Sequence, residues 1–334
     1  MLFEKQILNA YKKKLFSRCD DTGCVFYYSA SDFAGLKQEP YAFSAKAGHR
    51  MQGYFYFYGE PNADRIVVFD HGMGGGHRSY MKEIEMLARH GYRVFSYDHT
   101  GCMESEGEST HGFSQSLSDL DDCLTALKSD ARFQGASYSV VGHSWGGFAT
   151  LNIPALHPDV THIVAMSGFL SVEAILKQNF SGLMGGYYQS IYALEEQENP
   201  AFVGYDARKT FSRMRTKAFV LYSADDKIVR AIDHYAPLRR ACEGLSNVHF
   251  MLVNHKGHNP NFTTDAVRYK DAFFADLTKR IKKKALADDD ARRAFVKSYD
   301  WDRMTAQDEE VWSKIFRVLD SAQNEAFVRG RKRK

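Results

Sequence analysis

The sequence has few cysteines and no long apolar segment. Its 5 cysteines are odd in number and match no zinc or disulfide spacing, so we expect free thiols in a reducing compartment. The sequence begins Met1-Leu2-Phe3-Glu4-Lys5, and charges recur through Lys12-Lys13-Lys14, so we expect no apolar signal-peptide core. No stretch has the length and apolar character needed to span a bilayer. We therefore expect a cytoplasmic protein without stable membrane insertion. The cysteines are Cys19, Cys24, Cys102, Cys123 and Cys242.

The sequence also lacks an excess of charge of either sign. It has 44 Lys and Arg against 41 Asp and Glu, a net charge of +3. A nucleic-acid-binding surface would need a basic patch, so we expect no nucleic acid as partner. No Walker-type loop or dinucleotide-binding glycine pattern occurs, and His77, His99 and His111 lack the spacing of a metal site such as H-E-x-x-H. We expect no metal and no cofactor.

What the sequence does contain is a regular alternation of short apolar runs with helical segments. This alternation predicts an α/β fold with a mostly parallel sheet and helices on both faces. Residues 41–59, rich in aromatic side chains, predict paired antiparallel strands at the start of the sheet. Ligands of such sheets bind beyond the carboxyl ends of the strands. The apolar runs span residues 66–70, 92–97, 138–141, 162–167, 218–222 and 248–253.

The most informative motif is Gly142-His143-Ser144-Trp145-Gly146-Gly147. It follows one apolar run and precedes a helical segment, which predicts a strand, a sharp turn carrying a serine, and a helix. The two flanking glycines leave room where the turn crowds neighbouring chain. Such a corner exposes the hydroxyl of Ser144 and directs helix-start N–H groups toward a developing oxyanion. The motif therefore predicts a nucleophilic serine.

A nucleophilic serine needs a base, and the base needs an orienting carboxylate. Asp225 and Asp226 follow the apolar run that ends at residue 222, and His255 and His258 follow the next. The order serine, acid, histidine suits this kind of fold. Spacing alone does not choose between the two neighbours at either position.

A glycine-rich loop, His71-Gly72-Met73-Gly74-Gly75-Gly76, follows the apolar run 66–70. Backbone N–H groups in such a loop can bind an oxyanion. A phosphate cradle is the rival interpretation, and the absence of a nucleotide-binding motif disfavours it. We expect His71 to hold this loop in place through a hydrogen bond.

These motifs together resemble the α/β-hydrolase superfamily, and within it the branch of serine aminopeptidases, lysophospholipases and monoacylglycerol lipases. The resemblance covers roughly residues 50–280 and includes Tyr97-Asp98-His99-Thr100-Gly101 and Asp226-Lys227-Ile228-Val229. One departure is Cys102-Met103-Glu104, where a second glycine is common. That loop lines the site indirectly, so the departure weakens the substrate analogy rather than the catalytic one.

The resemblance selects among the candidate residues. In that family the acid precedes x-x-Val, which selects Asp226, and the histidine follows a glycine, which selects His258. The oxyanion N–H groups come from the residue after His-Gly and the residue after the nucleophile, here Met73 and Trp145. The implied triad is Ser144, Asp226 and His258, with no metal and no cofactor.

The long segment 169–211 interrupts the strand–helix rhythm and is too long for a loop. We interpret it as a small helical cap, and residues 1–168 and 212–285 as the hydrolase core. Apolar cap residues either bind the substrate or join the cap to the body. The pocket candidates are Phe180, Leu183, Met184, Tyr187 and Tyr188.

Residues 286–334 extend beyond a minimal hydrolase. Thr305-Ala306-Gln307-Asp308 resembles an N-cap, and Val311, Ile315 and Leu319 form one apolar stripe. We expect a helical extension packed on the core. A role of this extension in a homodimer stays open.

The predicted activity is a serine hydrolase that cleaves a carboxylic ester of small size, lipid-like or aromatic, in the manner of a carboxylesterase or lysophospholipase. Two alternatives stay open. An aminopeptidase or amidase would need an acid near the cap to hold the substrate amine, and Glu195, Glu196 and Glu198 are candidates. A non-catalytic protein would use the pocket only to bind a ligand.

Overall fold

The computed structural model describes residues 3–60 and 64–322, apart from the side chain of Leu183. Its strands are β1 (Lys37–Ser44), β2 (Arg50–Phe57), β3 (Arg65–Asp70), β4 (Arg93–Tyr97), β5 (Ser137–His143), β6 (His162–Met166), β7 (Lys217–Ser223) and β8 (Val248–Val253). They form one sheet in the order β1-β2-β4-β3-β5-β6-β7-β8. The pairs β1–β2 and β2–β4 are antiparallel, and the other neighbours are parallel. The predicted α/β fold with a mostly parallel sheet is confirmed.

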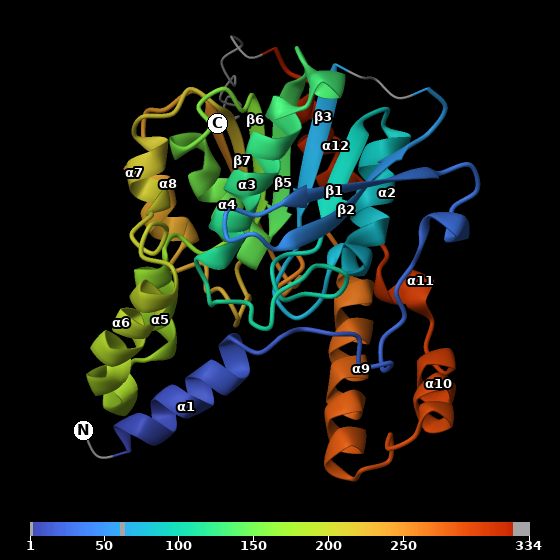
Figure 1. Cartoon of the computed structure of the whole chain (residues 1–334), viewed down its shortest axis with the longest axis vertical. Coiled ribbons are helices and arrows are strands. Elements are labelled where there is room, and N and C mark those ends of the chain that lie inside the picture. The colour runs from blue at the N-terminus through green and yellow to red at the C-terminus, as the bar shows by residue number, and fades with distance from the viewer. Residues whose placement is uncertain (1–2, 61–63, 323–334) are drawn as a thin grey trace, which may run out of the picture.

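Helices cover both faces of this sheet (Figure 1). In chain order they are α1 (Glu4–Leu15), α2 (Met81–Arg89), α3 (Gln115–Ser129), α4 (Trp145–Asn152), α5 (Val172–Asn179), α6 (Tyr188–Glu198), α7 (Ala207–Phe211), α8 (Tyr235–Ala241), α9 (Thr264–Lys282), α10 (Asp289–Lys297), α11 (Trp301–Met304) and α12 (Glu309–Leu319). Apolar residues of α3, α4 and α8 lie in one buried cluster, and those of α2 and α12 lie in another.

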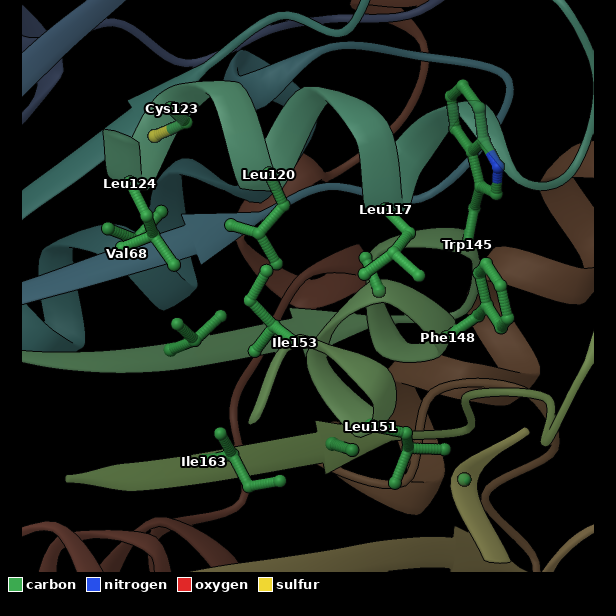
Figure 2. Close-up of a cluster of buried hydrophobic side chains, with 14 of the residues drawn as sticks. Val68, Leu117, Leu120, Cys123, Leu124, Trp145, Phe148, Leu151, Ile153 and Ile163 are labelled. Carbon is green, nitrogen blue, oxygen red and sulfur yellow. The ribbon is translucent and has the colours of Figure 1, made fainter. Parts of the chain in front are cut away.

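The strands supply side chains to both clusters because successive residues point to opposite faces. Val68 of β3 and Val140 of β5 lie in the first cluster, and the adjacent Val67 and Val141 lie in the second. Figure 2 shows the first cluster, where the leucines of α3 lie against Phe148 of α4 and the sheet. Continuous runs of β-branched residues are therefore what a sheet buried on both faces requires.

The C-terminal helix α12 packs directly on the sheet. Val311, Ile315 and Leu319 are each at most 2% exposed and share the second cluster with Phe69 and Phe219 of the strands. The side chain of Asp308 caps the helix by accepting a hydrogen bond from the N–H of Val311 at 3.1 Å. The extension thus completes the cover of this face, as far as residue 322; residues 323–334 lie outside the described part of the chain.

Helices α5 and α6 lie beyond one edge of the sheet, within the segment predicted as a cap, and α1 lies beside them (Figure 1). The sequence did not predict a contact between α1 and this segment. The hydroxyl of Tyr11 donates a hydrogen bond to the buried carboxylate of Glu195 in α6. Farther along the chain, Arg18 donates to the carbonyls of Met103 at 2.6 Å and Ser105 at 2.9 Å. The N-terminal segment therefore joins the cap to the loop after β4.

Glu195 is expected to make stability depend on pH. Burial raises the pKa of this carboxyl group from its ordinary 4.5 to about 7, although it accepts hydrogen bonds from Tyr11 and from the N–H of Phe113. Between pH 4.5 and 7 the folded state then binds more protons than the unfolded state, so the free energy of unfolding falls as the pH rises through this window. The loss is at most about 3 kcal/mol.

We expect Glu195→Gln to lack this loss, because an amide does not ionise. Urea unfolding of both proteins at several pH values measures the difference. Glu196→Gln is the matched control, since Glu196 is the exposed neighbour; it should keep the wild-type dependence on pH. The same slope in wild type and Glu195→Gln would contradict the assignment.

The described residues contain no helix with both the length and the mean hydropathy needed to cross a membrane. All five cysteines are free thiols. Cys19 and Cys102 lie opposite each other in an isolated β-bridge.

Candidate active site

Ser144 stands on a strained turn between β5 and α4. Its backbone has φ 56° and ψ −109°, a conformation that a residue with a Cβ rarely adopts. The turn also requires its glycines: a Cβ on Gly146 would lie 2.1 Å from the carbonyl oxygen of Asp70, and one on Gly142 would lie 2.5 Å from the carbonyl oxygen of Gly146. The motif therefore folds as predicted, with Ser144 only partly buried at the carboxyl end of β5.

The structure brings Ser144 together with the two partners that the resemblance selected. The Oγ of Ser144 lies 2.8 Å from Nε2 of His258, and Nδ1 of His258 lies 2.8 Å from Oδ2 of Asp226. Asp226 is 4% exposed, and its other oxygen accepts hydrogen bonds from the N–H groups of Ile228 (2.8 Å) and Val229 (3.0 Å). The carboxylate is thus held in one orientation, facing the imidazole.

The competing residues, Asp225 and His255, face elsewhere. Oδ1 of Asp225 accepts from the hydroxyl of Ser223 at 2.5 Å and from the N–H groups of Lys256 and Gly257 at 3.3 Å each. His255 is exposed and has φ 60°. Asp225 therefore holds the loop that carries the histidine, rather than the histidine itself.

The two N–H groups predicted to bind an oxyanion belong to Trp145, which follows Ser144, and to Met73, whose neighbour Gly72 lies so close to Ser144 that an added Cβ would be 3.4 Å from the Cβ of Ser144. Trp145 begins α4, where N–H groups have no acceptor within the helix. Its indole is 1% exposed and donates to the carbonyl of Phe113 at 2.7 Å. Met73 lies in the glycine-rich loop after β3, and the N–H of its neighbour Gly72 donates to the hydroxyl of Tyr80 at 3.1 Å.

His71 contacts this loop, and His99 contacts His71 in turn. Nδ1 of His71 lies 2.8 Å from the carbonyl of Gly72, and Nε2 accepts from the N–H of His99 at 3.0 Å, as expected for a structural histidine. Burial and the neighbouring His99 lower the pKa of His71 to about 3. Burial also lowers the pKa of His99, but Asp70 and Asp119 at 3.0 and 3.1 Å outweigh it and raise the value to about 10.

Tyr80 is a site residue that the sequence did not reveal. Besides Gly72, its hydroxyl contacts Nδ1 of His143 at 2.9 Å, and Nε2 of His143 contacts the carbonyl of His258 at 2.6 Å. Burial lowers the pKa of His143 well below its ordinary value, so this ring is neutral. It accepts from Tyr80 and donates to His258, which links the glycine-rich loop to the histidine loop. No local pattern distinguishes Tyr80 from any other helix-start tyrosine.

Several of the predicted pocket residues of the cap lie where the cap packs against the rest of the protein. Phe180, Tyr187 and Tyr188 are half-buried against the first cluster, and the ring of Phe180 lies 6.1 Å from that of Tyr11 in α1. Met184 is 39% exposed. The side chain of Leu183 lies outside the described part of the structure. Binding of substrate by these residues stays a prediction.

Of the three acids considered for an amine, two already have partners. Glu195 accepts from Tyr11 and from the N–H of Phe113, and Glu198 lies 2.9 Å from Nδ1 of His111. Glu196 is exposed. Within the described ranges 3–60 and 64–322, no group of three or more His, Cys, Asp and Glu side chains is arranged to hold a metal ion.

A mostly parallel sheet, a serine on a strand–helix elbow, and an acid and a histidine on the loops after β7 and β8 are the features of the α/β-hydrolase fold, and the chain has this fold. Residues 61–203 match the family described as Serine aminopeptidase, S33. This match contains the elbow and most of the cap but ends before the acid and the histidine.

One curated protein is similar over part of the chain. "Putative carbamate hydrolase RutD" of Pantoea ananatis (strain LMG 20103) is 27% identical over 129 residues, which are 38% of this chain and 45% of that protein. The chain therefore matches less than half the length of this relative.

Solved esterases share the fold. The esterase Pf2001 of Pyrococcus furiosus has a TM-score of 0.56 at 16% identity, over 80% of this chain and 97% of its own. The acetyl xylan esterase of Paenibacillus sp. R4 has a TM-score of 0.55 at 16% identity, over 77% of this chain and 88% of its own.

Proposed function

We propose that this protein is a serine hydrolase that cleaves carboxylic esters. The observation that carries the proposal is the hydrogen-bonded series Ser144–His258–Asp226, with 2.8 Å at each step, on a strained elbow. Nε2 of His258 takes the proton of Ser144 as Oγ attacks the acyl carbonyl. Asp226 keeps the other proton on Nδ1 and stabilises the imidazolium. The N–H groups of Met73 and Trp145 bind the oxyanion.

The attack of Oγ forms a tetrahedral intermediate, which then collapses as the ester C–O bond breaks. His258 returns its proton to the departing alcohol, which leaves the acyl group on Ser144. Water attacks this acyl-enzyme as His258 takes its proton, and His258 then gives that proton to Oγ of Ser144 as the acyl C–O bond breaks and the carboxylic acid is released. The sequence of steps needs no group beyond the side chains and backbone named here.

Amide cleavage is the second candidate, because the family match is to serine aminopeptidases. Such a substrate would bring a positively charged amine. The partners of Glu195 and Glu198 within the protein leave Glu196 as the exposed carboxylate of this group. Ester cleavage is therefore the better supported activity.

A fluorophosphonate probe tests the mechanism directly. We expect covalent labelling of Ser144, located by mass spectrometry of the digested protein, because the probe needs an activated serine and an oxyanion site. A ligand-binding protein without catalysis would bind esters and stay unlabelled. In parallel, p-nitrophenyl esters of graded chain length run beside aminoacyl anilides decide between the two candidates: higher kcat/KM on every anilide would reject the ester proposal.

A further inference from the structure

A cavity lies against the glycine-rich loop, on the side of the molecule away from the cap. It has a volume of about 210 Å³ and is enclosed by Gly72–Gly75, by residues 25–28 of the N-terminal segment, and by side chains of α9 and α11. Figure 1 shows α9 and α11 on the opposite side of the molecule from α5 and α6. Asn259, which follows His258, also lines it. A ligand in this cavity would thus contact segments directly joined to the proposed oxyanion and base residues.

Aromatic side chains are prominent in the cavity wall. Three elements distant in sequence supply them: the ring of Phe26 lies 6.0 Å from that of Trp301, which in turn lies 5.1 Å from that of Phe273. Arg78 holds residues 27 and 28 in place by donating to both carbonyls, at 3.0 and 3.2 Å. Rings braced in this way form a preformed surface for a flat apolar group. The aromatic lining comprises Phe26, Tyr27, Tyr28, Tyr80, Phe262, Phe273, Phe274 and Trp301.

Two cationic residues line the same cavity: Arg78, whose guanidinium donates to the carbonyls of residues 27 and 28, and Lys270 of α9. The ammonium of Lys270 lies 4.9 Å from the ring centre of Phe262 and donates to Oδ1 of Asn259 at 3.1 Å. Lys270 and both of these neighbours line the cavity. An ammonium has three donors, and Asn259 is the one acceptor that it finds among the described residues. Two donors are left for a ligand or for solvent.

Glu83 also lines the cavity, and its charge acts on Lys270 more strongly than that of Asp271. It is 2% exposed, and its Oε1 accepts from the side-chain amide of Asn261 at 3.0 Å rather than from Lys270. Burial raises the pKa of Glu83 and lowers that of Lys270, so burial disfavours the charged form of each. A ligand carboxylate next to Lys270 would favour the ammonium form again, since opposite charges stabilise each other.

We propose that this cavity is a subsite for a carboxylate carried on an aromatic ring, with Lys270 binding the carboxylate and the surrounding rings binding the flat group. Its use as a substrate subsite rests on the proposed ester hydrolysis. The substrate is then an ester with one anionic aryl carboxylate on either its acyl or its alcohol part. The volume is below the roughly 300–1,000 Å³ of pockets for larger ligands, so it suits a single ring rather than a long acyl chain.

Binding of benzoate, compared with the neutral benzamide, tests the subsite without catalysis. Isothermal titration of the wild-type protein should give a Kd at least about tenfold lower for benzoate, as expected for a hydrogen bond between charged groups. Lys270→Met should abolish this preference, and Lys270→Arg, which keeps the charge, should retain part of it. Equal affinities in the wild type, or no saturable binding of either compound, would overturn the proposal even if Lys270→Met failed to fold.

Two pairs of esters distinguish the sides of the substrate. 4-Acetoxybenzoate carries the carboxylate on the departing phenol, and mono-4-nitrophenyl terephthalate carries it on the acyl group. Each is compared with the same ester in which a primary amide replaces the carboxylate. In one of the two pairs, we expect kcat/KM to be about tenfold higher for the carboxylate ester than for its amide counterpart. Lys270→Met should lose this preference. No preference in either pair would reject the substrate role.

The two proposals fail in different ways. If no ester is cleaved but benzoate binding depends on Lys270, the hydrolase proposal fails and the subsite stands. If the neutral esters are cleaved and benzoate does not bind, the subsite fails and the hydrolase proposal stands.

Discussion

Replacing Ser144 by alanine is expected to lower kcat/KM for an activated ester by at least about 10⁴-fold, because the substitution removes the hydroxyl that Nε2 of His258 contacts. Alanine keeps the Cβ and the strained backbone, so the fold should be unchanged. Hydrolysis of p-nitrophenyl acetate measures the rate, and thermal unfolding followed by circular dichroism measures the stability. Rates near those of the wild type in this variant would reject Ser144 as the nucleophile.

Ser144→Gly is a sharper companion to this variant. At φ 56° a glycine avoids the clash that any Cβ suffers, so Ser144→Gly should be as inactive as Ser144→Ala but more stable by about 1–3 kcal/mol. Together the two variants separate the catalytic role of the hydroxyl from the strain in the backbone of the elbow. Loss of activity follows from the missing hydroxyl, and the stability difference reports the strain that the fold maintains at the nucleophile.

The sheet and the elbow could be predicted because local patterns encode them. A run such as Val67-Val68 needs a strand with two buried faces, and Gly142 and Gly146 are required wherever a turn brings backbone this close. The signal for each of these features lies within a few residues, so a single sequence contains it.

Contacts between distant side chains could not be predicted in this way. Tyr11 and Glu195 are 184 positions apart, and Tyr80 and His143 are 63 apart. Nothing in the sequence around these four residues marks them as partners. The aromatic wall that includes Phe26 and Trp301 needs both ends of the chain in place. The substrate side of the site depends on such contacts, so the sequence predicted the chemistry better than the pocket.

The choice between Asp225 and Asp226 is intermediate between features that local sequence patterns predict and contacts that they do not predict. Both aspartates follow β7, and the sequence chose between them only through a family resemblance. The structure orients them differently: Asp226 faces Nδ1 of His258 at 2.8 Å, and Asp225 accepts from Ser223 and from backbone N–H groups of the histidine loop. Two neighbouring carboxylates with such different partners should respond very differently to the same substitution.

Asp226→Asn is therefore expected to lower kcat by about 10⁴-fold, because an amide that donates toward Nδ1 favours the tautomer with the proton on Nε2, which cannot accept from Ser144. Asp225→Asn should cost less than about tenfold, since an amide oxygen still accepts from Ser223 and the loop N–H groups. Steady-state kinetics on one ester, with thermal unfolding of both variants, makes the comparison. An inactive Asp225→Asn beside an active Asp226→Asn would mean that the acid of this triad stands one position earlier, and that the hydrogen bond between Asp226 and His258 does not orient the base during turnover.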